Sequence, residues 1–230
     1  MSNPGKPIFA LAVLASLSIA ACGPKRLAVI APLTDPGRSA EALEGRSRLT
    51  APARIDFSWE LNEEGSRASG VGVARVEPPY RARLDLFLEN GETVVAAALV
   101  DDELRLPYGA PDDILPPVEL MWGTLGVFRP VRGSRLLGGD RLEGEAERLR
   151  YGSDQGTEIH YEVASGQVEA LEMLEGETVV QWVRLANAED GGYPRSATYR
   201  NLVDFRELKI TRERVSASSQ FDPSIWDPRQ

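Results

Sequence analysis

Apolar and polar residues alternate from Arg54 to Leu61, where Ile55, Phe57 and Trp59 are separated by polar side chains. A period of two predicts a half-buried β-strand. Stretches of the same kind recur as far as residue 215 and predict about eleven strands. They cover residues 54–61, 69–77, 81–89, 93–100, 104–108, 146–151, 157–164, 167–174, 178–188, 195–201 and 205–215.

Most of these strands are joined by tight turns, and Asn90-Gly91 is the strongest two-residue hairpin signal among them. Successive tight hairpins predict an antiparallel up-and-down sheet. A sheet of so many strands has to curl into a barrel or split into two sheets. Residues 132–140, rich in Gly and Arg, are interpreted as a link within this mainly β fold.

Two segments have helical patterns. Residues 39–49 begin with Ser39 as a candidate cap and contain good helix formers. Residues 118–128 lie between Pro116-Pro117 and Pro130, the usual positions of proline around a helix. The strand at residues 93–100 is apolar on both faces, so its sheet has to be covered on both sides. We expect the second helix to provide one cover, as a lid.

The N-terminal segment has the pattern of an export signal. Lys6 precedes an apolar run from Ile8 to Ala20, which is shorter than the roughly 20 residues of a membrane-spanning helix. Ile19-Ala20-Ala21-Cys22 resembles the lipobox of bacterial lipoproteins. The resemblance implies that residues 1–21 are a signal peptide and that Cys22 carries the lipid anchor. An ordinary export signal with a coincidental cysteine is the alternative.

Residues 22–38 are interpreted as a lipidated tether because they combine glycine and proline with little periodicity. A first strand at residues 27–30 is the alternative interpretation. The turn-rich residues 224–230 are interpreted as a C-terminal tail at the surface.

Composition excludes several classes of protein. The chain has 230 residues, 26 basic and 35 acidic side chains and a net charge of −9, which argues against nucleic-acid binding and against adsorption to an anionic membrane. Membrane attachment would therefore come from the lipid on Cys22. Cys22 is the only cysteine, so no internal disulfide and no cysteine-based metal site is expected.

Candidate catalytic residues are few. His160 is the only histidine and shares the polar face of its strand with Glu158 and Glu162, an arrangement more typical of a solvated strand than of a metal site. Acidic pairs at 101–102 and 112–113 are interpreted as solvated turns rather than as glycosidase carboxylates. Gly70-Val71-Gly72 predicts a close approach of the backbone within a strand rather than a phosphate loop. The sequence predicts no enzyme, no cofactor and no metal.

An apolar set of residues predicts either a ligand cavity or a dry core. A curled sheet with an apolar inner face, covered by a helix containing Met and Trp, can hold an apolar ligand. A barrel filled by its own side chains has the same sequence pattern, so both interpretations stay open. The candidate lining residues are Phe57, Trp59, Leu84, Leu86, Val95, Leu99, Leu120, Met121, Trp122, Leu125 and Trp182.

The order of elements over residues 39–223 resembles the lipoprotein-localisation (LolA/LolB-like) superfamily. The strand pair from Gly70 to Leu84, with Pro79 and Arg83, and the closing strands that end in Phe221-Asp222-Pro223 look like the motifs of that superfamily. The resemblance implies an open half-barrel whose apolar concave face, covered by helices, receives acyl chains of lipoproteins or lipids.

The resemblance also implies a place in the cell. It favours a lipid-anchored protein at the outer membrane that faces the periplasm, since Gly23 rather than Asp follows Cys22, with a periplasmic carrier or an envelope complex as a partner. Anchored members are expected to carry an apolar residue protruding from a loop between two early strands, whereas here the turn Glu89-Asn90-Gly91-Glu92 is polar. The competing hypothesis is a non-enzymatic structural or interaction lipoprotein with a filled core.

Overall fold

The structure is a computed structural model that describes residues 27–110, 114–189 and 192–228. Its helices are α1 (Pro36–Ser47) and α2 (Val118–Thr124), with short 3-10 helices η1 (Glu143–Glu145) and η2 (Pro223–Trp226). Its strands are β1 (Val29–Pro32), β2 (Ala53–Glu63), β3 (Ser66–Glu77), β4 (Arg81–Leu88), β5 (Thr93–Val100), β6 (Glu103–Arg105), β7 (Arg135–Leu142), β8 (Glu147–Gly152), β9 (Thr157–Ala164), β10 (Gln167–Glu175), β11 (Thr178–Ala186), β12 (Ser196–Asn201) and β13 (Arg206–Ala217).

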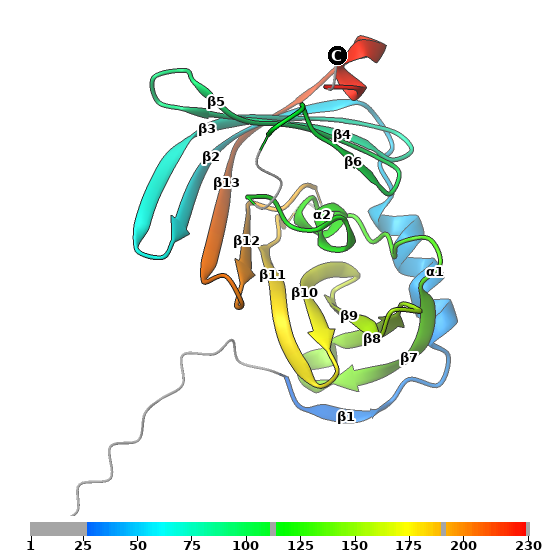
Figure 1. Ribbon diagram of the computed structural model, residues 1–230. Helices are drawn as coiled ribbons and strands as arrows, with labels where there is room; N and C mark the ends of the chain where they lie inside the picture. Colours follow the sequence, from blue (N-terminus) through cyan, green and yellow to red (C-terminus); the bar gives the residue numbers. More distant parts are fainter. Residues whose placement is uncertain (1–26, 111–113, 190–191, 229–230) are drawn as a thin grey trace, which may run out of the picture.

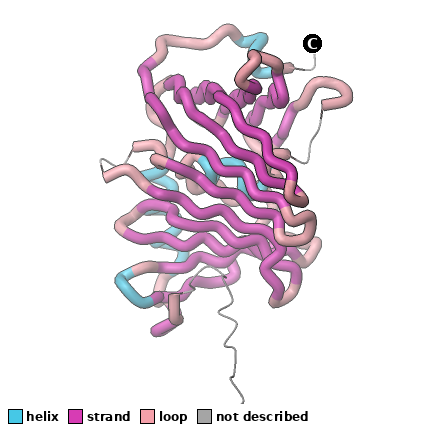
Figure 2. Tube along the Cα trace, turned by 90° about the vertical axis from the view of Figure 1, so that its left-hand side faces the viewer, coloured by secondary structure: helices cyan, strands magenta, loops and turns pink. Residues whose placement is uncertain are grey.

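All described strands belong to one antiparallel sheet in the order β1-β7-β8-β9-β10-β11-β12-β13-β2-β3-β4-β5-β6. Two meanders, β2–β6 and β7–β13, are joined where the long strand β13 pairs with β2. The sheet curls around α2, while its two ends, β1 and β6, do not pair with each other (Figure 1). Figure 2 shows the strands running diagonally across the outer side of the curled sheet. The predicted mainly β, antiparallel and open half-barrel fold is confirmed.

The sheet has thirteen strands rather than about eleven, and the two additional strands pair with each other. Strand β7 lies in the segment that we expected to be a link. Its glycines allow a close crossing, since a Cβ on Gly139 would lie 2.7 Å from a side-chain carbon of Leu33 and 2.9 Å from the carbonyl oxygen of Arg148. A strand packed so closely needs glycine and therefore lacks the alternating apolar pattern.

Strand β1 lies within the expected tether, so that interpretation was wrong for residues 29–32. The alternative interpretation, a strand at residues 27–30, is correct except that the strand begins and ends two residues later. The strand pairs with β7, and the backbone N–H of Leu33 donates to the carbonyl of Gly139 (2.9 Å). Val29 and Ile30 remain more than half exposed. Backbone hydrogen bonds rather than burial therefore hold β1, which explains why its side chains gave only a weak signal.

Helix α1 begins three residues earlier than predicted. Asp35, not Ser39, is the N-cap, and its carboxylate accepts a hydrogen bond from the backbone N–H of Arg38 (3.0 Å). Pro36 occupies the first turn, where its missing N–H has no partner to lose. Ala40 and Leu43 are buried and join the core inside the half-barrel.

Inner-face residues of β2 pack on the glycines of β3. A Cβ on Gly72 would lie 2.3 Å from the ring of Phe57, and one on Gly70 would lie 1.9 Å from the carbonyl oxygen of Phe87. The indole N–H of Trp59 donates to the carbonyls of Val71 (3.1 Å) and Phe87 (3.2 Å), in the space that the glycines of β3 leave open. The predicted close backbone approach at these glycines is confirmed.

The C-terminal segment is part of the folded domain, so the prediction of a surface tail was wrong for residues 224–226. Helix η2 contacts β4 and β5 on the outer face of the sheet, and Trp226 is 5% exposed. Arg83 donates to the carbonyl of Ile225 (3.0 Å) and Arg105 to that of Trp226 (3.1 Å). This cover explains why β5 is apolar on both faces: Ala98 is buried under the outer cover.

Candidate functional site

Helix α2 lies inside the curve of the sheet, against β10, β11 and β12. Its residues Leu120, Met121 and Trp122 are at most 2% exposed, and Trp122 donates through its indole N–H to the carbonyl of Asp101 (2.8 Å). The helix ends at Thr124 rather than near Phe128, because Gly126 adopts a positive φ of 75°.

Three features make α2 intrinsically weak. The helix has seven residues, its N-cap is Pro117, and no side chain caps its first turn. Its interior contains Gly123, where a Cβ would lie 2.4 Å from a side-chain carbon of Leu171. A helix this short is not stable by itself in water and depends on its tertiary contacts.

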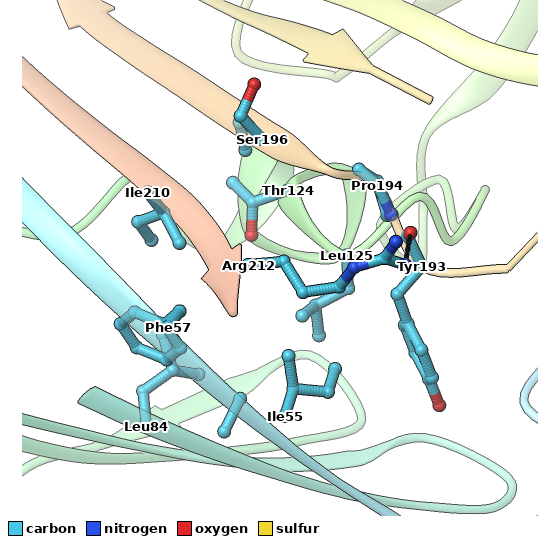
Figure 3. A pocket seen from close by; sticks show the side chains of 12 residues that line it. Ile55, Phe57, Leu84, Thr124, Leu125, Tyr193, Pro194, Ser196, Ile210 and Arg212 are labelled. Carbon is cyan, nitrogen blue, oxygen red and sulfur yellow. Dashed lines mark hydrogen bonds between the residues drawn. The ribbon is translucent and has the colours of Figure 1, made fainter. Parts of the chain in front are cut away.

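An apolar cavity of about 40 Å³ lies beside the last turn of α2. It is bounded by β2, β3, β4, β12, β13 and the connection before β12, so it lies where the two meanders meet (Figure 3). Its lining residues are Ile55, Phe57, Ala74, Leu84, Thr124, Leu125, Tyr193, Pro194, Ser196, Ala197, Ile210 and Arg212.

The polar groups of this cavity are few and uncharged apart from Arg212. No acidic side chain belongs to the described lining. Burial raises the pKa of the Tyr193 phenol to about 12, so this group stays neutral at physiological pH. A small apolar cavity with one cation can accept an apolar chain that has a polar or negatively charged end.

A second hollow, of about 290 Å³, lies beside the first turn of α2. Glu119, Tyr151, Ile159 and Tyr161 contribute to its wall, together with the segment 130–134 and the β8–β9 turn. Phe128 packs edge-on against Tyr161, with ring centroids 4.8 Å apart, and burial raises the pKa of the Tyr161 phenol. Helix α2 therefore lies between two hollows, one at each of its ends.

The structure brings most of the predicted lining residues together in one core, but few of them line the cavity beside Thr124. Nine are buried in the shared apolar cluster, and Leu125 packs against it. Only Phe57, Leu84 and Leu125 contribute to the wall of that cavity. As a lipid site the set stays a prediction.

Trp182 was assigned to the wrong face of the sheet. It pairs with Glu172 on β10 and Arg200 on β12, whereas its neighbour Val183 pairs with Leu171 in the core. Adjacent residues of a strand point to opposite faces, so Trp182 lies on the outer face. It is nevertheless 7% exposed, and the guanidinium carbon of Arg200 lies 5.3 Å from its ring centroid.

His160 also lies on the outer face, away from both hollows. It contacts Glu158 (3.1 Å), while Glu162 is bound by Arg148 and Arg184 (2.9 Å each). Burial lowers the pKa of His160, an effect that the hydrogen bond to Glu158 opposes. In the described part of the chain no three His, Cys, Asp or Glu side chains cluster as metal ligands would. The acidic pair 112–113 lies outside the described residues.

An exposed apolar tip was missed by the sequence analysis. The β12–β13 turn presents Leu202, Val203 and Phe205, which are 40%, 64% and 76% exposed. The side chain of Asn201 accepts hydrogen bonds from the backbone N–H groups of Val203 (2.9 Å) and Asp204 (3.1 Å) and fixes the turn. The family resemblance implies an apolar protrusion between two early strands in anchored members, where this chain has the polar turn Glu89-Asn90-Gly91-Glu92; the exposed apolar tip lies between β12 and β13.

Sequence reasoning also missed most of the cavity wall. Ile210 and Arg212 follow Leu208 at a spacing of two along β13, so the alternation of that strand does place them on the inner face. Arg212 continues the inward-facing series of Leu208 and Ile210, and a charged residue at such a position was the signal in the sequence that could have revealed the site. Tyr193 and Pro194 lie in a connection, where no periodicity reveals the direction of a side chain.

No protein-family model matches the sequence, and no curated protein matches it significantly. Solved structures do. A domain named as an outer membrane lipoprotein-sorting protein of Vibrio parahaemolyticus superimposes with a TM-score of 0.58 at 10% identity, over 82% of this chain and 94% of that one. A LolA superfamily protein of Nitrosomonas europaea gives 0.54 at 8% identity, over 81% and 96%. A DUF1329 family protein of Desulfovibrio piger gives 0.56 at 9% identity, over 86% and 98%.

These comparisons assign the architecture. The chain has a LolA-like fold over most of its length, which is the class of domain that the curled sheet and the enclosed α2 define. Among the described helices, none has the length and apolar character needed to cross a membrane. Cys22 and the signal peptide lie outside the described residues, so lipidation stays a prediction.

Proposed function

We propose that this protein is a non-enzymatic carrier that binds acyl chains of lipids or lipoproteins inside its half-barrel. One observation carries the proposal: the hollow of the sheet is occupied by a seven-residue helix with no side-chain cap, and a cavity adjoins each end of that helix. The LolA-like fold supports it, as does a structural neighbour named for lipoprotein sorting.

Binding of a whole acyl chain requires α2 to move. The cavity beside Thr124 measures about 40 Å³, which is room for roughly three water molecules. The buried residues Leu120, Met121 and Trp122 occupy the part of α2 between Thr124, which lines this cavity, and Glu119, which lines the other hollow. Displacement of α2 would join the two spaces into one channel that is apolar beside Thr124 and more polar beside Glu119. Its short length and its dependence on tertiary contacts make α2 suited to such a movement.

The competing function is that of a non-enzymatic envelope protein with a filled core that docks on a partner. The size of the cavity beside Thr124 favours it, because no acyl chain fits there while α2 is in place. The two hypotheses differ in whether the protein takes up an apolar ligand.

Uptake of a fluorescent long-chain fatty acid separates the two hypotheses. We expect the purified protein to bind the probe and its native mass spectrum to show bound lipid. Leu125→Glu places a charge in the cavity wall and should abolish uptake while the circular-dichroism spectrum of the sheet is retained. Val71→Glu, an equal change on the exposed outer face of β3, is the matched control and should bind normally. No uptake by the unaltered protein, together with a lipid-free mass, would establish the filled-core alternative.

The proposed location is the periplasmic side of the outer membrane, with Cys22 as the lipidated anchor. Val29 begins β1 only seven residues after Cys22, a reach of about 25 Å when fully extended. The folded domain would therefore stay near the bilayer, where the exposed tip at Leu202, Val203 and Phe205 could touch the lipid. Cys22→Ala should move most of the protein from the membrane fraction to the soluble periplasm, and full retention in the membrane fraction would contradict the anchor. A periplasmic carrier or envelope complex would be its partner.

A further inference from the structure

Two arginines near the end of β13 point to opposite faces of the sheet. Arg212 pairs with Phe57 on β2, and Arg214 pairs with Asp56, because the register shifts between them. Residues two apart on a regular strand would share a face, so this bulge is what separates them. Arg214 binds Asp56 on the outer side (2.7 Å), whereas Arg212 lines the apolar cavity.

Arg212 has no counter-charge in the described part of the chain. Its guanidinium donates to the backbone carbonyl of Tyr193, and no carboxylate lies within ion-pair distance among the described residues. Figure 3 shows its side chain extending past Thr124 and Leu125 towards that carbonyl, with the apolar wall of Ile55 on the other side. The side chain is half-buried. A charge withdrawn from water is costly unless an opposite charge pairs with it.

The guanidinium retains hydrogen-bond capacity for a ligand. It carries five N–H donors in a planar fork, which suits the two oxygens of a carboxylate or phosphate. The remaining polar side chains of the wall are neutral: Ser196 and Tyr193 carry hydroxyl groups, and the hydroxyl of Thr124 already donates to the carbonyl of Met121 (2.7 Å). Every described neighbour of the cavity is therefore compatible with a negative charge and none repels it.

We propose that Arg212 binds the anionic end of an amphiphilic ligand whose apolar chain lies along the inner face of the half-barrel. The ligand class is a lipid with a carboxylate or phosphate group, such as a fatty acid or a phospholipid. The ester- and amide-linked chains of a lipoprotein carry no charge at their linkage and would leave Arg212 unpaired. This inference rests on the proposed carrier function and names its ligand class.

Three fluorescent probes of equal chain length test the proposal: a carboxylic acid, its methyl ester and a lysophosphatidate. The unaltered protein should bind an anionic probe about tenfold or more tightly than the ester, as expected for a charge-assisted hydrogen bond. A preference for the acid identifies the carboxylate as the natural end, and a preference for the lysophosphatidate identifies the phosphate.

Arg212→Gln should remove that preference and leave ester binding unchanged, so the ester reports on the integrity of the fold. Arg212→Lys should restore part of the preference because it restores the charge. Arg214→Gln, two residues away on the outer face, should behave like the unaltered protein. Equal binding of acid and ester, unaffected by Arg212→Gln, would overturn the inference and leave the acyl site standing. If the unaltered protein binds none of the probes, both proposals are overturned.

Discussion

The inner and outer faces of the sheet are each covered by a short helical segment, but the two covers are held differently. Inside, α2 is held by buried Leu, Met and Trp side chains and by one side-chain hydrogen bond, from Trp122 to Asp101. Outside, η2 is held by Trp226 and by two arginines, Arg83 and Arg105, that donate to its carbonyls. The inner contacts are mostly non-directional, so α2 can move without leaving several polar groups unpaired.

Charged side chains also differ between the inner and outer faces of the sheet. The outer face of β8–β11 carries Arg148, Glu162, Arg184 and Glu172 in a linked series of ion pairs, each 2.9 Å long. Glu162 and Glu172 are 6% and 2% exposed, so this network is largely buried beneath its own arginines. Among the described residues that line the inner cavity there is one cation, Arg212, and no acidic side chain. The charges of this outer network are paired with one another, whereas Arg212 has no carboxylate partner among the described residues, and this difference distinguishes a structural surface from a candidate binding surface.

The largest expected effect comes from removing the outer cover. Trp226→Ala should lower the free energy of unfolding by about 4 kcal/mol, because a buried tryptophan is lost and a cavity is left over β4 and β5. Urea unfolding followed by circular dichroism measures the change. Val71→Ala, on the exposed outer face of β3, is the control and should change stability little. A small effect of Trp226→Ala would mean that η2 contributes little to the stability of the fold.

A smaller loss is expected from breaking the outer ion-pair network. Arg184→Met removes the 2.9 Å ion pairs of Arg184 with Glu172 and Glu162 and should lower the free energy of unfolding in urea by about 3 kcal/mol. The double variant Arg184→Met with Glu172→Leu should recover much of this loss, because Glu162 keeps Arg148. Arg135→Met is the control, since the pair of Arg135 with Asp154 is mostly exposed. Equal losses in the single and double variants would contradict this explanation.

The ion-pair network also makes the free energy of unfolding depend on pH. Burial alone would raise the pKa of Glu162, but the hydrogen bonds and charges of Arg148 and Arg184 lower it below its usual value. A lowered folded pKa contributes stability above the unfolded pKa of about 4.3 and loses it as pH falls through the folded value. The cost of Arg184→Met should therefore be largest at neutral pH and shrink under acidic conditions.

The smallest effect on the free energy of unfolding concerns the exposed tip at Leu202, Val203 and Phe205, and it is an increase rather than a loss. Phe205 adopts a positive φ of 51°, a conformation that is costly for a bulky side chain, and it is 76% exposed. Phe205→Gly should raise the free energy of unfolding by roughly 0.5 kcal/mol, since relief of strain outweighs the added flexibility. The same change should weaken co-sedimentation of the Cys22→Ala protein with phospholipid vesicles.

Val203→Gly is the control for this pair of effects. Val203 is 64% exposed in the same turn but has no positive φ, so its replacement should weaken vesicle binding without the gain in stability. Unchanged vesicle binding in both variants would contradict a membrane contact at the tip.

Local patterns predicted the elements that bury one regular face. The alternation in β2, the hairpin at Asn90-Gly91 and the two-sided apolar strand β5 all follow from side-chain periodicity and turn chemistry. The same logic failed for β1 and β7, where backbone hydrogen bonds and closely packed glycines replace an apolar pattern. It also failed for Trp182, since hydrophobicity alone does not reveal which face of a strand is the inner one.

The sequence by itself determined the class of fold: a long antiparallel meander with an interior helix, because period-two patterns and tight turns act between neighbouring residues. Only the tertiary structure decided the pairing of β13 with β2, the outer position of Trp226 and the outward direction of Arg214. Each of these depends on contacts between residues far apart in the chain. The alternation of β13 places Arg212 on the inner face, whereas a bulge between Arg212 and Arg214 turns Arg214 outward, and no local pattern encodes that bulge.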